Sequence, residues 1–239
     1  MAAVTDNPLQ NVTFPSNGGT AHGYLAVPAS GSGPGIVVIQ EWWGLTNHIA
    51  DVTNRLAAEG FVALAPDLYG GRTTHDAGEA GELMQELPVQ QAARDLAGAV
   101  DFLLAHESVT SQEGTERKVG AVGFCMGGGF VLVLAAQQGD KIGAAVPFYG
   151  VLKEDFPSFA GLTAPLLGHF GEQDEVAGPD AVRALAARIE AESGVRPEFH
   201  IYPAGHAFFN DENHLGTYDP EQAQVAWTRT LEFLRAHLA

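Results

Sequence analysis

Short apolar runs alternate along the chain with longer segments in which apolar residues recur at helical spacing. The runs Gly35–Glu41 and Val119–Phe124 are typical of strands that are buried on both faces. In Asn47–Glu59 the apolar residues stand three or four positions apart, which predicts an amphipathic helix, and Gly60 is suited to end it. This alternation indicates right-handed crossovers and a mostly parallel sheet with helices on both faces. The sequence therefore predicts an α/β fold.

The rest of the chain extends the same pattern. Asn11–Pro15 and Ala21–Val27 favour two antiparallel strands, joined by a turn at residues 16–19. Further strands are expected at Phe61–Pro66, Ala144–Phe148, Pro165–Phe170 and Phe199–Tyr202. Further helices are expected at Pro88–His106, Met126–Gln138, Pro179–Glu192 and Glu221–Leu238. Because no repeat or long linker interrupts the pattern, we expect a single domain over residues 1–239.

Composition and charge exclude several classes of function. The 239 residues carry a formal net charge of −17 with only 12 lysines and arginines, which argues against a nucleic-acid partner. No segment approaches the ~18 apolar residues that span a bilayer, so we expect no membrane partner. The first residues lack the features of a secretory signal, which favours a cytoplasmic protein. The single cysteine, Cys125, excludes an internal disulfide and a cysteine-rich metal site.

Cys125 stands in the sequence Gly-Phe-Cys-Met-Gly, between an expected strand and an expected helix. This is the strand–turn–helix elbow that carries the nucleophile of α/β-hydrolases, with cysteine in place of the commoner serine. At Gly123 and Gly127 a Cβ atom would clash with neighbouring backbone in such a turn. The N-terminus of the following helix favours a thiolate. A buried cysteine in tight strand–helix packing is the alternative interpretation.

In this fold the nucleophile, the acid and the base follow one another along the chain. Asp174 ends the turn Gly-Glu-Gln-Asp after the strand that ends at Phe170, and it is the favoured acid, with Glu172 and Glu175 as competitors. His206 follows the next strand in a glycine-bearing loop and is the expected base. His169 falls inside an expected strand and is interpreted as a core or supporting residue. The histidines expected at the surface or in loops are His22, His48, His75, His106, His200, His214 and His237.

These three side chains predict a hydrolase that works through a thioester acyl-enzyme. His206 keeps Cys125 as a thiolate or removes its proton, and Asp174 holds the imidazole tautomer. The thiolate adds to an acyl carbon, the alkoxide leaves, and water activated by His206 hydrolyses the thioester. The backbone N–H groups of Met126 and Trp42 are expected to form the oxyanion hole.

Glu41 ends the first buried strand and is expected to lie near Cys125. A carboxylate beside a thiol can accept its proton or disfavour its ionised form. A plain acid at the end of a strand is the alternative.

Taken together, these residues resemble the dienelactone hydrolase (carboxymethylenebutenolidase) family of the α/β-hydrolase superfamily, over nearly the whole chain. The motifs that carry the resemblance are QEWWG at 40–44, APDLY at 65–69, GFCMGG at 123–128, FYG at 148–150, GEQD at 171–174 and AGHAF at 204–208. The family's cysteine, aspartate and histidine match Cys125, Asp174 and His206, and its glutamate matches Glu41. The resemblance implies a monomer without metal or organic cofactor that acts on a small-molecule ester or lactone.

The chain departs from the family at the substrate carboxylate. Relatives that cleave dienelactone hold this carboxylate with two arginines, but Asp76–Gln91 contains none and Asn210 occupies the second position. Arg72 could substitute from a nearby loop. The wall of the substrate pocket is expected to include Trp42, Trp43, Tyr149 and Phe208.

Two other interpretations stay open. A broader carboxylesterase or thioesterase of the same fold would act on neutral substrates. A thiol redox sensor would oxidise Cys125 and hydrolyse nothing, but the chain has no second cysteine to resolve a sulfenic acid.

Overall fold

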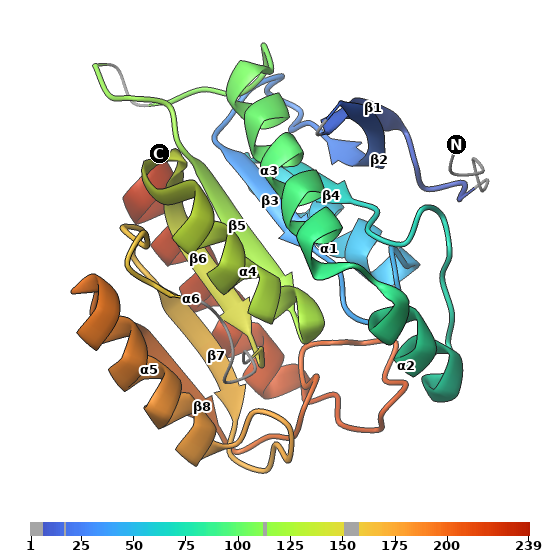
Figure 1. Cartoon of the computed structure of the whole chain (residues 1–239), viewed down its shortest axis with the longest axis vertical. Coiled ribbons are helices and arrows are strands. Elements are labelled where there is room, and N and C mark those ends of the chain that lie inside the picture. Colours follow the sequence, from blue (N-terminus) through green and yellow to red (C-terminus); the bar gives the residue numbers. More distant parts are fainter. Residues whose placement is uncertain (1–6, 17, 112–113, 151–157) are drawn as a thin grey trace. The chain divides into compact units, whose positions relative to one another are not determined.

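The computed structural model describes residues 7–16, 18–111, 114–150 and 158–239 (Figure 1). Position 17, in the expected turn between the first two strands, lies outside the described residues. The chain divides into two units, Met1–Val119 and Gly120–Ala239.

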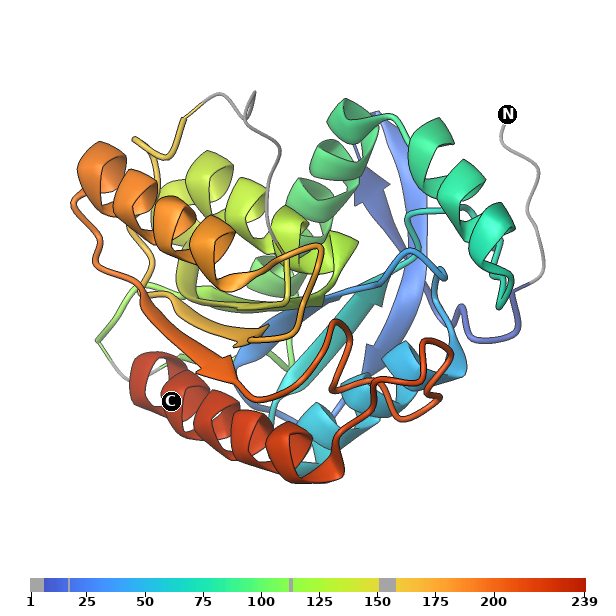
Figure 2. The ribbon, with the colours of Figure 1, turned by 90° about the horizontal axis from the view of Figure 1, so that it is seen from below.

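The first unit contains four strands in the order β1-β2-β4-β3. β1 pairs with β2 and β2 pairs with β4 in antiparallel register, whereas β3 and β4 are parallel. Figure 2 shows α1 and α3 on opposite faces of these strands. Every residue of β3 and β4 is buried because helices cover both faces. The strands are β1 (Val12–Ser16), β2 (Gly19–Ala26), β3 (Gly35–Ile39) and β4 (Val62–Pro66), and the helices are α1 (Asn47–Ala58), α2 (Ala77–Glu86) and α3 (Val89–Ala105).

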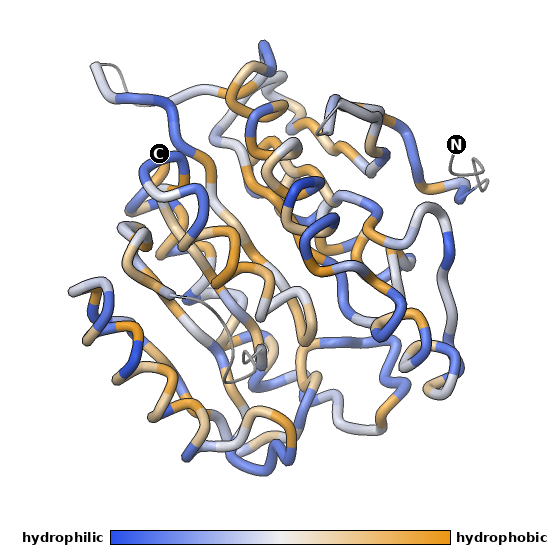
Figure 3. The backbone as a smooth tube through the Cα atoms, viewed as in Figure 1, coloured by the Kyte–Doolittle hydropathy of each residue, from blue (hydrophilic) through white to orange (hydrophobic). Residues whose placement is uncertain are grey.

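The second unit contains strands in the order β5-β6-β7-β8, and β6, β7 and β8 pair in parallel. α4 and α5 lie on one face of these strands and α6 lies on the other (Figure 2). Hydrophobic residues extend along most of α4 (Figure 3). The strands are β5 (Val119–Phe124), β6 (Ile142–Phe148), β7 (Leu167–Gly171) and β8 (Glu198–Tyr202). The helices are α4 (Met126–Gln138), the short 3-10 helix η1 (Gly139–Lys141), α5 (Pro179–Ser193) and α6 (Pro220–Leu238).

This architecture confirms the predicted α/β fold, with two kinds of correction. α2 was not expected as a helix; it begins at Ala77, and the carboxylate of the N-cap residue Asp76 accepts the N–H of Glu79 at 2.9 Å and so caps the first turn. His48, expected at the surface, is only 2% exposed. It lies one turn before the buried Val52 on the same face of α1.

Prolines account for two shifted element ends. β7 begins at Leu167, two positions after the expected Pro165, because proline has no N–H to donate to a strand ladder. Pro88 caps α3 instead of occupying its first turn. None of the helices in the described part of the chain has the length and apolar content needed to cross a membrane.

Candidate active site

Cys125 occupies a strained backbone conformation between β5 and α4. Its φ is 53° and its ψ is −117°, values that a residue with a Cβ rarely adopts. Its N–H donates to the carbonyl oxygen of Phe148 at 3.1 Å, and its own carbonyl accepts the N–H of Gly128 at 3.0 Å. Strain of this kind persists only where the surroundings impose it, and it concentrates at functional sites.

Two glycines allow the backbone to pass closely around this turn. A Cβ on Gly123 would lie 2.3 Å from the carbonyl oxygen of Gly127, so the predicted close approach of these two positions is present. A Cβ on Gly128 would lie 2.6 Å from the carbonyl oxygen of Phe148, a contact that the sequence did not indicate. Both positions exclude larger residues because the crowding atoms belong to backbone.

Asp174 lies in the loop after β7 and is 4% exposed. Its Oδ1 atom accepts the N–H groups of Val176 and Ala177 at 2.7 and 2.8 Å, and its Oδ2 atom lies 2.7 Å from Nδ1 of His206. Burial alone would raise the pKa of Asp174, but the hydrogen bonds and the charge of His206 outweigh it and lower that pKa below its usual value. The competing acids Glu172 and Glu175 are exposed.

His206 follows β8 and bridges the other two side chains. Its Nδ1 atom contacts Asp174 at 2.7 Å, and its Nε2 atom lies 3.2 Å from Sγ of Cys125. Burial would lower the pKa of His206, but hydrogen bonding to Asp174 and Cys125 and their negative charges raise it to about 10. The two ring nitrogens of His206 therefore face a carboxylate on one side and a sulfur on the other.

The loop around His206 is held on two sides. The hydroxyl of Thr217 donates to the carbonyl oxygen of His206 at 2.5 Å. The ring of Tyr149 meets the imidazole edge-on, with 5.2 Å between the ring centroids. Tyr149 itself has a φ of 38°, and its N–H donates to the carbonyl oxygen of His169 at 2.7 Å. The sequence predicts Tyr149 only as a pocket residue and gives no indication of Thr217.

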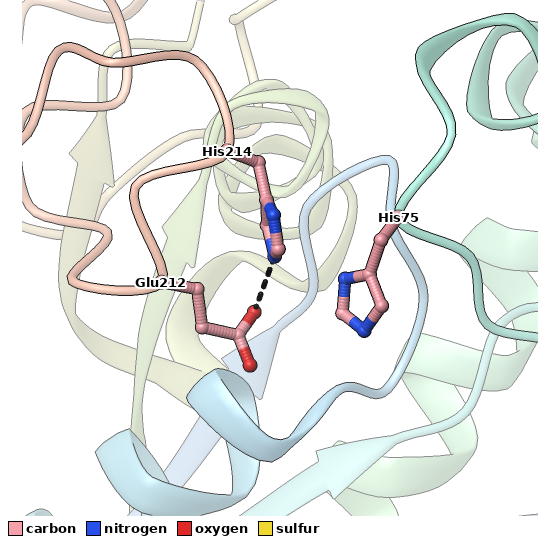
Figure 4. Close-up of side chains that lie close together, drawn as sticks. All are labelled: His75, Glu212 and His214. Carbon is pink, nitrogen blue, oxygen red and sulfur yellow. Dashed lines mark hydrogen bonds and ion pairs between the residues drawn. The ribbon is translucent and has the colours of Figure 1, made fainter.

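Two of the expected pocket residues are buried beside this loop. Phe208 is 0% exposed and packs against Tyr149 with 5.6 Å between ring centroids. Asn210 is 4% exposed, and its Oδ1 atom accepts the N–H of Glu212 at 2.9 Å. Figure 4 shows the carboxylate of Glu212 hydrogen bonded to the ring of His214, at 3.2 Å. Asn210 therefore supports the turn that carries this pair.

Apart from Met126, the remaining expected site residues belong to the first unit. Glu41 is 2% exposed, and the rings of Trp42 and Trp43 meet at 60° with 4.8 Å between centroids. Arg72 forms an ion pair with Glu86 at 3.1 Å, and its side chain is 51% exposed. Their proximity to Cys125 stays a prediction, as does the role of the Met126 N–H.

Comparison with known proteins identifies the family. The sequence model of the dienelactone hydrolase family matches residues 21–238. The chain belongs to the dienelactone hydrolase family. As a member it is a hydrolase, and the family resemblance predicted from the sequence is confirmed.

Relatives and solved structures agree over nearly the full length. The chain is 35% identical to "Protein usf" of Aquifex pyrophilus, over 96% of this chain and 99% of that protein. It is 31% identical to a "Putative carboxymethylenebutenolidase" of Aquifex aeolicus, with the same coverage of 96% and 99%. A crystal structure of a "Putative Dienelactone Hydrolase" from Klebsiella pneumoniae matches with a TM-score of 0.80 at 30% identity, over 94% of this chain and 96% of that one. This structural match confirms the α/β-hydrolase fold.

Proposed function

We propose that the protein hydrolyses a small ester or lactone, with Cys125 as nucleophile, His206 as acid and base, and Asp174 as the group that orients His206. The observation that carries the proposal is the imidazole of His206, which contacts the carboxylate at 2.7 Å and the sulfur at 3.2 Å. A nucleophile, a base and a third group that orients the base are the recurring parts of covalent acyl transfer.

The first half of the reaction begins from an ion pair between the thiolate of Cys125 and the imidazolium of His206. The thiolate of Cys125 attacks the acyl carbon, and the bond from that carbon to the leaving oxygen breaks. The alkoxide takes the proton from Nε2 of His206, so the imidazole becomes neutral and the acyl group is held as a thioester. Asp174 stays ionised throughout and keeps the Nδ1 proton on the ring.

The second half depends on a change in the pKa of His206. Cys125 supplies two of the effects that raise that pKa, a hydrogen bond and a negative charge. Acylation removes the charge on sulfur, so the pKa of His206 falls in the thioester. The neutral imidazole can then take a proton from water, whose oxygen attacks the thioester carbon. The thiolate leaves and pairs again with the protonated His206.

The developing oxyanion needs two N–H donors. The N–H of Met126 is the first candidate because this residue begins α4 directly after Cys125. The N–H of Trp42, in the loop that follows β3, is the expected second donor. Glu41 remains the expected auxiliary carboxylate near the nucleophile.

The substrate class follows from the charges. Relatives bear the names dienelactone hydrolase and carboxymethylenebutenolidase, but this chain has Asn210 and an arginine-free segment where such relatives place arginines. Arg72, the possible substitute, is engaged by Glu86. The net charge of −17 further disfavours anions. We therefore propose neutral esters or lactones with an apolar acyl group, which includes the broader carboxylesterase interpretation.

A substrate panel tests this proposal. The rates of hydrolysis of an aryl acetate, a neutral aromatic lactone and a carboxylate-bearing lactone are compared in the wild type and in Cys125→Ala. We expect the neutral substrates to equal or exceed the anionic lactone in kcat/KM, and Cys125→Ala to hydrolyse none of them. Retention of most of the activity in Cys125→Ala would contradict the role of Cys125, and a preference of more than about 100-fold for the anionic lactone would contradict the substrate class.

A further inference from the structure

A second histidine is buried in the same unit and takes no part in the proposed reaction. His169 lies in β7 and is 0% exposed. Both ring nitrogens are engaged, Nδ1 with the hydroxyl of Tyr202 in β8 at 2.8 Å and Nε2 with the hydroxyl of Thr230 in α6 at 3.0 Å. One imidazole therefore joins two neighbouring strands to the helix that covers them.

The surrounding donors select one tautomer of His169. The hydroxyl of Thr230 donates its proton to the carbonyl oxygen of Ala226 at 2.9 Å, so its oxygen accepts the Nε2–H of His169. Nδ1 must then accept the hydroxyl proton of Tyr202, whose oxygen accepts an N–H from Arg229 at 3.0 Å. Burial, together with the charges of His200 and Arg229, lowers the pKa of His169 well below its usual value, which agrees with a neutral ring. Each hydrogen bond in this network thus has a defined donor and a defined acceptor.

The backbone of Tyr202 connects this network to the loops that carry the acid and the base. Its carbonyl oxygen accepts the N–H of Glu172 at 2.7 Å, in the loop that leads to Asp174. The N–H of Gln173 in the same loop donates to the carbonyl oxygen of Ala204 at 3.0 Å, two residues before His206. Backbone hydrogen bonds therefore join the loop of Asp174 to the loop of His206, directly after Tyr202, whose side chain is hydrogen bonded to His169.

The backbone of His169 provides a second connection. Its carbonyl oxygen accepts the N–H of Tyr149 at 2.7 Å. The ring of Tyr149 in turn packs edge-on against His206, with 5.2 Å between centroids. A shift of His169 would therefore reach the imidazole of His206 from two directions, through the loop backbone and through an aromatic contact.

We propose that His169 is a positioning residue, which through Tyr202 and Tyr149 holds the contact between Asp174 and His206 in its reactive geometry. The inference rests on the proposed function of these two residues. Small displacements of reacting groups are costly in rate while leaving substrate binding intact, so the effect should fall on kcat. A residue that only stabilised the fold would leave both kcat and the Asp174–His206 hydrogen bond unchanged.

His169→Phe tests the proposal because it keeps an aromatic ring and removes both nitrogens. We expect kcat for a neutral ester to fall at least about tenfold with little change in KM. The downfield proton resonance of the Nδ1–H of His206, followed by NMR, should shift or broaden. Ile189→Ala is the control: Ile189 is 0% exposed in α5, which covers the face of the strands opposite to α6, and it makes none of the hydrogen bonds described above. Its truncation should therefore destabilise the fold while kcat and the resonance stay as in the wild type.

Two further variants keep the test informative if His169→Phe does not fold. Thr230→Val and Tyr202→Phe each remove one partner of the ring and should reproduce the loss of kcat and the altered resonance in milder form. Normal kcat and an unchanged resonance in these variants and in His169→Phe, where that variant folds, would overturn the proposal. The resonance is read without turnover, so an active Cys125→Ala enzyme would contradict the proposed function and leave this measurement valid.

Discussion

The Nε2 atom of His206 lies 3.2 Å from the Sγ atom of Cys125, although 81 positions separate the two residues in the sequence. β5 ends directly before Cys125, and β8 ends at Tyr202, four residues before His206. The two strands point the same way (Figure 1), so both side chains lie at the carboxyl-end edge of the strands in the second unit. The opposite nitrogen of the ring contacts Asp174, which makes the three groups one connected unit.

A connected unit should fail as a whole when one member is removed. His206→Ala and Asp174→Asn should each lower kcat/KM for a neutral ester, His206→Ala by about 10⁴-fold. The double variant should be barely slower than His206→Ala, because Asp174 acts only through the imidazole. Steady-state kinetics on the three variants provide the measurement. If the loss of kcat/KM in the double variant equalled the product of the two single losses, the two residues would act independently.

The raised pKa of His206 can be measured directly. NMR titration of its ring protons should give a pKa near 10 in the wild type, and a lower value in Cys125→Ala, because that variant lacks the hydrogen bond and the charge of the sulfur. A pKa near 6.5 for His206 in the wild type would contradict the ion pair.

The same pKa makes a prediction for stability. The pKa of His206 in the folded state is raised above the ordinary value of 6.5, so its contribution to stability is fully present below 6.5 and is lost as the pH rises toward 10. Urea unfolding should therefore show a larger loss of stability in the wild type than in Cys125→Ala over this window. For Asp174 the sign is opposite: its contribution is present above 3.8 and is lost as the pH falls below that value.

The backbone around the elbow should tolerate no added methyl group. Gly123→Ala places a Cβ 2.3 Å from a backbone oxygen and should lower the free energy of unfolding by about 3 kcal/mol, with loss of activity. The matched control is Gly81→Ala in α2, where a Cβ would meet nothing within 4 Å. That substitution should stabilise the protein by about 0.5–1 kcal/mol. Thermal or urea unfolding distinguishes the two outcomes.

Charge repulsion should appear as a salt effect on substrate choice. Because the chain carries a net charge of −17, raising the ionic strength should increase kcat/KM for a carboxylate-bearing lactone and leave that for a neutral ester unchanged. Equal salt responses would argue against long-range repulsion. Asn210→Arg is unsuited as a test of the missing arginine, since Asn210 is buried and its side chain accepts the N–H of Glu212.

Sequence patterns were sufficient for the features that depend on local periodicity and spacing. The runs that became β5, β7 and β8 predicted strands, and the polar residues just beyond them predicted which side chains would meet at one edge. The helix α2 was not predicted from the sequence because it contains two glycines and few apolar residues, although Asp76 and Glu79 stand at capping spacing.

Features that depend on distant contacts could not be predicted. The hydroxyls of Tyr202 and Thr230 reach His169 from 33 and 61 positions away, and no local pattern marks such partners. The sequence favoured Asp174 as the acid, but setting aside Glu172 and Glu175 depended on the tertiary structure, since all three lie in one loop and only Asp174 is buried against His206.

The most direct test of Cys125 as the nucleophile is the detection of the acyl-enzyme. The wild type mixed with an aryl acetate should release a burst of phenol equal to the enzyme concentration, and mass spectrometry of the quenched protein should find one acetyl group, on Cys125. Cys125→Ala should show neither burst nor adduct. An acetyl group on another residue, or hydrolysis that proceeds without any modification of Cys125 under single-turnover conditions, would show that Cys125 is not the nucleophile.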